Sequence, residues 1–197
     1  MLRSMGYPEQ VLPNTIRSLE KNKKLAGAIY TVEGTKVDGL EAHETLLKWC
    51  SMLSVVPAGV VLICQPNDDT LAHMGELSAE TLSLKGVKGY IVDGGCRDTE
   101  FIEKIGFPIF RKYHTPKDIV GKWMPTGLGV VIDIGNVTVH TGDYVLADSD
   151  GIVIIPEALA EETVTKTEEI LQTENLVRKA IVEGVDPLEA YLTYGKF

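Results

Sequence analysis

Basic residues are in the minority in this sequence, and lysine and arginine never form a run of five or more. The chain has 19 lysines and arginines against 28 aspartates and glutamates, so its formal net charge is −9. Affinity for nucleic acids comes mostly from basic side chains that displace counterions from phosphates. We therefore expect no nucleic-acid partner, although a single arginine in a cleft can still bind a small anion.

Cysteines and long apolar runs are also scarce. Cys50, Cys64 and Cys96 form no C-x-x-C pair and lack the histidine spacing of a zinc site, which indicates free thiols in a reducing cytosol. The opening residues "MLRSMGYPEQ" contain no apolar segment of signal-peptide length, and no stretch approaches the ~18 apolar residues of a membrane span. We expect a cytoplasmic protein with no membrane partner.

Nucleotide-binding motifs are missing as well. The stretch "GGCRD" lacks the G-x-G-x-x-G form of a dinucleotide loop, and the chain has no Walker sequence, which disfavours nucleotide binding. What remains is an ordinary globular composition, with 44% hydrophobic and 24% charged residues in a chain of 197. This length predicts one domain with a sizeable core.

Helical and strand-like segments alternate over the first part of the chain. Helical periodicity covers residues 10–24, 39–53, 71–86 and 99–107, and strand-like runs cover residues 25–34, 60–65, 88–95 and 108–113. The strand, helix and strand within residues 60–95 form a βαβ unit, whose two strands are parallel. The loop 65–70, the helix start near Gly75 and the loop 93–98 should therefore converge at one edge of the sheet.

The remainder of the chain changes character. Residues 129–156 contain short β-rich runs separated by Gly-Asn, Thr-Gly-Asp and Ser-Asp-Gly turns. Residues 156–183 predict a long charged helix that ends at Gly184, and Ile170, Leu171 and Val177 give it an apolar side. Such a helix either reaches across to another subunit or lies solvated on the surface, and the pattern alone leaves both open.

Arg97 and Asp98 follow Gly94-Gly95 at the end of a buried strand, where a loop can display reactive side chains. An arginine can hold a carboxylate with two parallel hydrogen bonds, and an aspartate can hold a hard divalent cation through oxygen. Together they suit a small oxo-acid bound with magnesium. The alternative is an ordinary surface ion pair.

Three other residues near this loop carry competing interpretations. Glu76 begins the predicted helix 71–86, where it either reaches a metal-bound water or only complements the helix dipole. For His73 we favour a position on the helix surface over a role as general base. For Cys96 we favour a small packed side chain over a nucleophile.

Four stretches of the chain resemble the RraA-like family, which includes 4-hydroxy-4-methyl-2-oxoglutarate aldolase/oxaloacetate decarboxylase and is similar to the RNase E inhibitor RraA. They are "LAGAIYTVEG", "GELSAETLSLKGVKGYIVDGGCRD", "FPIFRKYHTPKD" and "TGDYVLADSDGIVIIP". The second stretch is the most specific, because the aldolases carry an acidic residue, twenty intervening residues and then Arg-Asp. Glu76 and Arg97 keep that interval here.

The resemblance implies an α/β fold, a three-layer β/β/α sandwich of the swivelling-domain type with a C-terminal helix. It implies a single RraA-like domain over residues 1–197, in which residues 157–197 are a helical extension that packs on a neighbouring subunit. The family assembles as homotrimers or homohexamers, with active sites between subunits.

The resemblance also implies a class II, metal-dependent pyruvate aldolase that decarboxylates oxaloacetate. By this analogy Arg97 binds the 2-oxo-acid and stabilises the enolate, while Asp98 anchors Mg²⁺ or Mn²⁺. Glu76 then holds a metal-bound water. A glutamate from the C-terminal helix of a neighbouring subunit assists proton transfer in the aldolases, and we place it at Glu174. The residues whose backbone amides surround the substrate carboxylate are Gly75, Glu76, Leu77 and Ser78.

The sequence departs from the characterised aldolases at two positions. Glu76 replaces their usual aspartate, and Ala72 occupies the position of a glycine. The RNase E inhibitors, in contrast, have lost the acid of the Arg-Asp pair, which Asp98 retains here. The sequence therefore favours a lyase over a protein-binding regulator of RNase E type. A site adapted to another substrate, such as a sugar-derived acid, is a third alternative.

Overall fold

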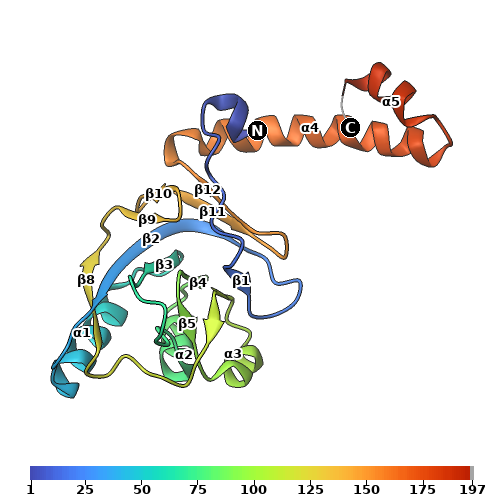
Figure 1. Ribbon diagram of the computed structural model, residues 1–197. Helices are drawn as coiled ribbons and strands as arrows, with labels where there is room; N and C mark the ends of the chain where they lie inside the picture. The colour runs from blue at the N-terminus through green and yellow to red at the C-terminus, as the bar shows by residue number, and fades with distance from the viewer. Residues whose placement is uncertain (196–197) are drawn as a thin grey trace. The chain divides into compact units, whose positions relative to one another are not determined.

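An eight-stranded mixed sheet forms the centre of residues 9–157 in the computed structural model, which describes residues 1–195 (Figure 1). Its strands are β1 (Arg17–Ser18), β2 (Leu25–Lys36), β3 (Val61–Gln65), β4 (Gly89–Val92), β6 (Ile109–Arg111), β8 (Trp123–Leu128), β11 (Tyr144–Ala147) and β12 (Ile152–Ile155). They lie in the order β1-β6-β4-β3-β2-β11-β12, and β8 also pairs with β2.

Two small strand pairs and three helices complete this unit. The antiparallel pair consists of β9 (Ile132–Ile134) and β10 (Val137–Val139), and the parallel pair of β5 (Gly95–Cys96) and β7 (Tyr113–His114). The helices are α1 (Ala42–Val55), α2 (Glu76–Leu84) and α3 (Thr99–Ile105).

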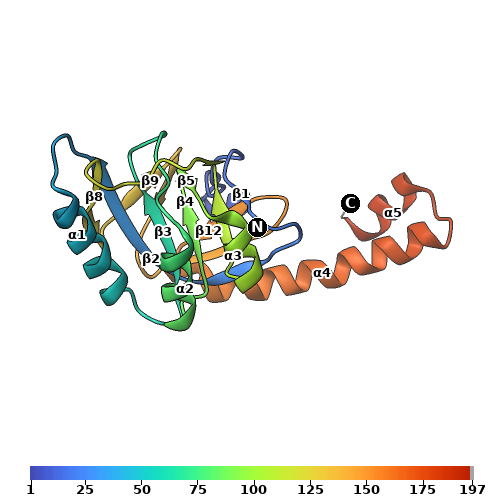
Figure 2. The same cartoon turned by 90° about the horizontal axis from the view of Figure 1, so that it is seen from below.

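Each of these helices connects two parallel strands of the central sheet. Strand β2 pairs in parallel with β3, β3 with β4, and β4 with β6. The predicted βαβ unit is therefore confirmed in β3-α2-β4. A second such unit, β2-α1-β3, precedes it, and a third, β4-α3-β6, follows it. Figure 2 shows α1, α2 and α3 on one face of the sheet, so the loops after β3 and β4 open at a common edge.

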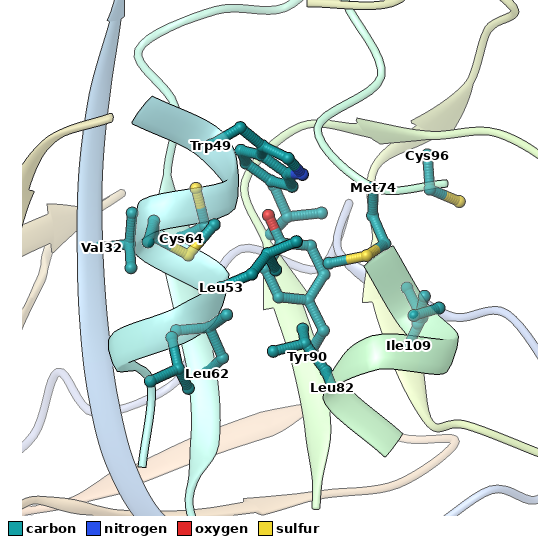
Figure 3. Close-up of a cluster of buried hydrophobic side chains, with 14 of the residues drawn as sticks. Val32, Trp49, Leu53, Leu62, Cys64, Met74, Leu82, Tyr90, Cys96 and Ile109 are labelled. Carbon is teal, nitrogen blue, oxygen red and sulfur yellow. The ribbon is translucent and has the colours of Figure 1, made fainter. Parts of the chain in front are cut away.

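Side chains on the two faces of the central strands enter two separate hydrophobic clusters. On β3, Leu62 and Cys64 face the helices, whereas Val61 and Ile63 face the opposite side. Figure 3 shows the helical side, where Trp49 and Leu53 lie against Tyr90. The opposite cluster includes residues of the β-rich segment: Ile132, Ile134, Val137, Val139, Val145 and Ile154. Helices, central sheet and β-rich layer make the three layers that we expected, so the α/β prediction is confirmed.

Residues 1–8 and 158–195 form the second unit. After a short 3-10 turn at Glu157–Leu159, helix α4 (Ala160–Val182) confirms the predicted long helix. Helix α5 (Pro187–Tyr194) was not anticipated. Asp186 caps it by accepting hydrogen bonds from the Leu188 and Glu189 amides.

Residues 196–197, the end of the predicted extension, lie outside the described part. The packing of this extension on another subunit stays a prediction. No helix within residues 1–195 has the length and apolar character to cross a membrane.

The predicted helix over residues 10–24 is wrong. Leu12 and Ile16 are spaced as in a helix, but both side chains are buried in the cluster on the β-rich side of the sheet. Pro13 lies between them and cannot donate the hydrogen bond that a helix requires. Instead, the Leu12 amide bonds to the Ile152 carbonyl at 2.9 Å, and a turn closed by the bond from the Ile16 amide to the Pro13 carbonyl leads into β1.

The predicted helix over residues 71–86 begins five residues late, at Glu76. The segment before it is held by other elements, since the Ala72 amide donates to the Lys117 carbonyl at 2.7 Å. Ala72 also forms a parallel bridge with Gly95. These contacts hold residues 71–75 alongside β5 in a non-helical conformation.

The absence of a side chain at Gly34 leaves the space in the sheet that the buried indole of Trp123 occupies. A Cβ at Gly34 would overlap the indole of Trp123, which is fully buried, and β2 has an irregular register at this point. Gly34→Ala should lower the free energy of unfolding by about 1–3 kcal/mol, because a well-packed core resists added atoms. Urea unfolding measures the change. Gly151→Ala is the matched control, because a Cβ there meets nothing within 4 Å; equal destabilisation of both variants would contradict the prediction.

Candidate active site

The short strand β5 carries the chain from the end of β4 to Arg97 and Asp98. Gly95 lies beside Ala72 through their parallel bridge. The Arg97 amide then donates to the Met74 carbonyl at 2.9 Å. The two segments thus run side by side, and the Arg97-Asp98 pair reaches the start of α2.

Asp98 is in close contact with the first residues of α2. Its Oδ2 atom accepts a hydrogen bond from the Glu76 amide at 3.1 Å, which satisfies one of the unpaired amides at the helix start. A Cβ at Gly75 would lie 2.7 Å from this oxygen and 3.0 Å from Arg97 Nε, so the approach depends on glycine. Asp98 itself has the left-handed backbone conformation, with φ of 58°.

Arg97 lies between two carboxylates. Its Nε is 3.5 Å from Asp98 Oδ2, and its Nη1 is 3.7 Å from Asp118 Oδ2. The three side chains are 42%, 33% and 44% exposed, respectively. The guanidinium is therefore held in place while part of it stays accessible to a ligand.

One cleft of about 450 Å³ brings together the residues that the sequence placed around the oxo-acid. Those that line it are Gly75, Glu76, Leu77, Ser78, Arg97 and Asp98. The predicted convergence of the helix start with the loop after β4 is confirmed as geometry. The predicted roles of these residues in catalysis and binding stay predictions.

Helix α1 and the loop after β7 supply the other walls of this cleft. Trp49 of α1 donates from Nε1 to Ser78 Oγ at 2.9 Å, which joins α1 to the first turn of α2. Asp118 was not identified from the sequence as a site residue. Its only signal was its place in the stretch "FPIFRKYHTPKD", where nothing distinguished it from a loop-capping aspartate. Its Oδ1 does accept a bond from the Val120 amide at 3.0 Å.

A second cleft, of about 330 Å³, lies against the same two residues. Arg97 and Asp98 line both clefts, and His114, Thr115 and Pro116 form part of the second one. His114 is fixed by Arg111, whose Nε donates to His114 Nε2 at 2.5 Å. The Arg97-Asp98 pair is thus a common wall between two cavities.

His73 is not on a helix surface, and that prediction is wrong. It precedes α2, and its side chain is fully buried with the imidazole packed edge-on against Trp123 at 5.1 Å between ring centroids. Its Nε2 lies 3.3 Å from Asp68 Oδ2, yet neither ring nitrogen has an aligned hydrogen-bond partner within residues 1–195. Sequence periodicity missed this because Leu71–Gly75 continues the helical spacing without being helical.

Burial lowers the pKa of His73 to about 4, and the attraction of Asp68 only partly opposes this. Burial alone would raise the pKa of Asp68. Hydrogen bonds from Thr70, Lys36 and Leu71 outweigh burial and lower it to about 2. At neutral pH the pair is therefore an uncharged imidazole beside a carboxylate, directly behind the cleft.

Cys96 is unsuited to nucleophilic chemistry at neutral pH. Its side chain is fully buried, and burial raises the pKa of the thiol to about 11 despite the opposing effect of Arg111. The expectation of a packed cysteine is confirmed. All three cysteines are free thiols, as expected, because none forms a disulfide.

The side-chain oxygen atoms at the cleft could bind a hard divalent cation only if water molecules complete its coordination. Within residues 1–195, no three histidine, cysteine, aspartate or glutamate side chains group closely enough to enclose a metal. The cleft does present oxygen ligands from Asp98, Glu76 and Asp118. Mg²⁺ is commonly held by one or two carboxylates and keeps several waters, so these residues are compatible with it.

Glu174 belongs to the second unit and does not line either of these clefts. It lies on α4, where it borders a separate cleft of about 400 Å³ with Val177, Arg178, Ile181 and Val182. Its predicted role requires a neighbouring subunit and stays a prediction.

Comparison with known proteins identifies relatives over most of the chain. Residues 2–154 match the RraA-like family, described as Aldolase/RraA. A Halalkalibacterium halodurans protein named "Putative 4-hydroxy-4-methyl-2-oxoglutarate aldolase" is 29% identical over 184 residues, 92% of this chain and 83% of that protein. The 4-hydroxy-4-methyl-2-oxoglutarate aldolase of Thermus thermophilus is 28% identical over 156 residues, 77% of this chain and 88% of that protein.

Solved structures show the same fold. An uncharacterized protein from Pseudomonas syringae pv. tomato superposes with a TM-score of 0.88 at 25% identity, covering 98% of this chain and 86% of its own. Streptomyces coelicolor RraAS2, described as an unusual member of the RNase ES inhibitor RraA protein family, superposes with a TM-score of 0.81 at 26% identity. That superposition covers 90% of this chain and 88% of RraAS2.

The buried imidazole behind the cleft predicts a specific pH dependence of stability. The folded pKa of His73, about 4, lies below the ordinary value of 6.5, so its contribution is complete above about pH 6.5 and is lost as the pH falls towards 4. Acidification from about pH 7 to about pH 4.5 should cost roughly 2–3 kcal/mol of unfolding free energy through this residue. His73→Phe should remove this part of the loss, as measured by urea unfolding at both pH values. His43→Phe, on the exposed side of α1, is the control, and an unchanged pH dependence in His73→Phe would refute the assignment.

Proposed function

Because the chain belongs to the RraA-like family, we propose that it is a lyase that cleaves a carbon–carbon bond of a small 2-oxo-acid with the help of a divalent metal ion. The observation that carries this proposal is the common cleft of Arg97, Asp98, Glu76 and the start of α2. The aldolase names of two relatives support the reaction class. Pyruvate is the expected product, from retro-aldol cleavage, from oxaloacetate decarboxylation or from both.

The start of α2 and Arg97 would bind the acid end of the substrate. The Glu76 amide is already bonded to Asp98, so the Leu77 and Ser78 amides are the ones that would meet the substrate carboxylate. The guanidinium of Arg97 would bind the neighbouring oxo group. This arrangement would place positive charge where a cleaved 2-oxo-acid develops negative charge.

Asp98 would hold Mg²⁺ or Mn²⁺, with Glu76 near enough to orient a coordinated water. When bound, the ion would supply positive charge that stabilises the enolate. Glu76 is one methylene longer than the aspartate of the characterised aldolases, and it lies half-buried at the edge of the cleft, which would take up that extra length. No Schiff base is needed, and Lys85 is committed elsewhere, since its Nζ donates to the Leu53 and Ser54 carbonyls.

The two reactions share one intermediate. In retro-aldol cleavage the C3–C4 bond breaks, the C4 hydroxyl loses its proton to a base, and the electron pair moves onto the C2 oxygen. In decarboxylation the C4 carboxylate leaves as CO₂ and the same enolate forms. Protonation at C3 then gives pyruvate. We assign the proton transfer to Glu174 of a neighbouring protomer in a homotrimer or homohexamer.

The rival function is that of a protein-binding regulator, because a structural relative is described as an RNase ES inhibitor family member. In that case the cleft would be a remnant without activity. The carboxylate of Asp98 favours the lyase, since the RNase E inhibitors resembled by this sequence lack that acid.

Pyruvate release from oxaloacetate separates the two functions. With Mg²⁺ present we expect activity well above the metal-only background, and EDTA should abolish it. Arg97→Ala should lower kcat/KM by about 100-fold or more, because an aligned donor to developing charge contributes that much. Arg17→Ala, which removes an exposed arginine of β1, should leave kcat/KM unchanged. Activity that survives both EDTA and Arg97→Ala would refute the metal-enolate mechanism, and inactivity on every oxo-acid would favour the regulator.

Mixed oligomers test whether Glu174 acts across a subunit boundary. Arg97→Ala and Glu174→Gln should each be inactive alone, whereas co-expressed chains should recover roughly a quarter of the wild-type activity, because some sites then combine two intact halves. Arg97→Ala mixed with Asp98→Asn is the control and should recover nothing, since both changes lie on the same side of the site. Absence of recovery with Glu174→Gln would assign the proton transfer to another residue.

A further inference from the structure

The hydroxyl group of Ser78 has a fixed acceptor role and an uncommitted proton. Trp49 donates from Nε1 to Ser78 Oγ at 2.9 Å, and because an indole nitrogen can only donate, the Ser78 proton must point elsewhere. This is the one hydrogen bond that Ser78 Oγ makes in the part of the chain that the structure describes. Ser78 lines the cleft and is half-buried there. Its hydroxyl is therefore a donor available to a ligand in the cleft.

The indole that bonds to this hydroxyl is itself fixed in the core. Trp49 is only 7% exposed and packs edge-on against Trp123, with 5.9 Å between the ring centroids. Trp123 is fully buried, and its Nε1 donates to the Pro66 carbonyl at 2.7 Å. Trp49 therefore cannot move away from α2 without opening the core. The Ser78 hydroxyl is thus held in one orientation instead of rotating freely.

The position of Ser78 in α2 directs its side chain towards the helix start. Ser78 is the third residue of α2, which begins at Glu76 with Gly75 as its N-cap. Side chains on a helix tilt towards its N-terminus, and a side chain at this third position can reach back to the N-cap. The amides of Leu77 and Ser78 are also without intrahelical partners there. Two amides and one hydroxyl therefore face the same end of the helix, and all three belong to a single protomer.

We propose that the Ser78 hydroxyl donates a hydrogen bond to the C1 carboxylate of the 2-oxo-acid, and that Trp49 is the positioning residue that aims this hydroxyl. The inference rests on the proposed function and adds a side-chain contact to the two backbone amides. The C1 carboxylate keeps its charge during cleavage and decarboxylation, whereas the oxo group beside Arg97 gains charge. Ser78 therefore binds the substrate and the transition state equally, so it determines KM and leaves kcat unchanged.

Removal of the hydroxyl tests this contact in the full-length chain with Mg²⁺. Ser78→Ala should raise KM for pyruvate release from oxaloacetate by about tenfold, the loss typical of a hydrogen bond to a charged group, and should leave kcat within about twofold. Calorimetric titration with oxalate, a planar dianion that resembles the pyruvate enolate, should show a similar weakening without any reaction. Ser78→Thr keeps a hydroxyl and should return KM and the oxalate affinity to within about threefold of the wild-type values.

A double-mutant cycle tests the positioning role of Trp49. Trp49→Phe keeps an aromatic ring in the core and removes the indole N–H group, so it should raise KM by about threefold on its own. In the Ser78→Ala background it should raise KM no further, because its effect passes through the hydroxyl. The double variant also leaves no indole N–H without an acceptor, and thermal unfolding checks that each variant folds. Effects on KM that multiply in the double variant would overturn the positioning role.

Thr81→Val is the matched control. Thr81 borders the same cleft one turn further along α2, but its hydroxyl donates to the Leu77 carbonyl at 2.6 Å, so its proton is already committed. The variant should keep the wild-type KM and oxalate affinity. An unchanged KM and affinity in Ser78→Ala, or equal changes in Thr81→Val, overturn the inference while pyruvate release still supports the lyase. Folded wild-type protein that releases no pyruvate from any oxo-acid overturns both proposals.

Discussion

The hydrogen bond from the Glu76 amide to Asp98 Oδ2 is the contact on which the candidate site depends. It joins the start of α2 to the loop after β5, just beyond the bridge between Ala72 and Gly95 that pairs the two segments. The left-handed backbone of Asp98 costs about 1–3 kcal/mol. A hydrogen bond to a charged acceptor contributes about 1.5–3 kcal/mol, so the contact can offset that cost. It also fixes the direction in which the adjacent arginine leaves the chain.

The layered core explains why this loop is rigid enough to present a site. Side chains of the central strands alternate between the helical layer and the β-rich layer, so both faces of the sheet are anchored. The buried imidazole of His73 and the indole of Trp123 fill the space directly behind the cleft. Trp123 is itself held by a 2.7 Å bond from Nε1 to the Pro66 carbonyl. Closely packed core side chains thus support the inner side of the cleft.

Much of this arrangement follows from local patterns in the sequence. The uninterrupted apolar runs of β3 and β4, with a helical segment between them, predict parallel strands whose following loops meet, and they do. The position of Arg97 and Asp98 at a strand end indicated a loop that can display reactive side chains, and both residues do line a cleft. Helix α1 and the long helix α4 were also evident from periodicity and from their bounding glycine and proline residues.

The elements that were missed share a physical cause, which is that long-range packing overrides local spacing. Leu12 and Ile16 mimic a helix but are buried against the β-rich layer, and residues 71–75 continue a helical rhythm while they lie extended beside β5. Asp118 enters the site through the fold of a loop, for which no periodic signal exists.

The left-handed conformation of Asp98 has an evolutionary consequence. Asparagine tolerates this conformation as well as aspartate does, and its side-chain oxygen can accept the same bond from the start of α2. The codons of the two residues differ by a single base. A single mutation can therefore remove the negative charge of the Asp98 side chain without disturbing the fold. Descendants of such a lyase can in this way become binding proteins without passing through a misfolded ancestor.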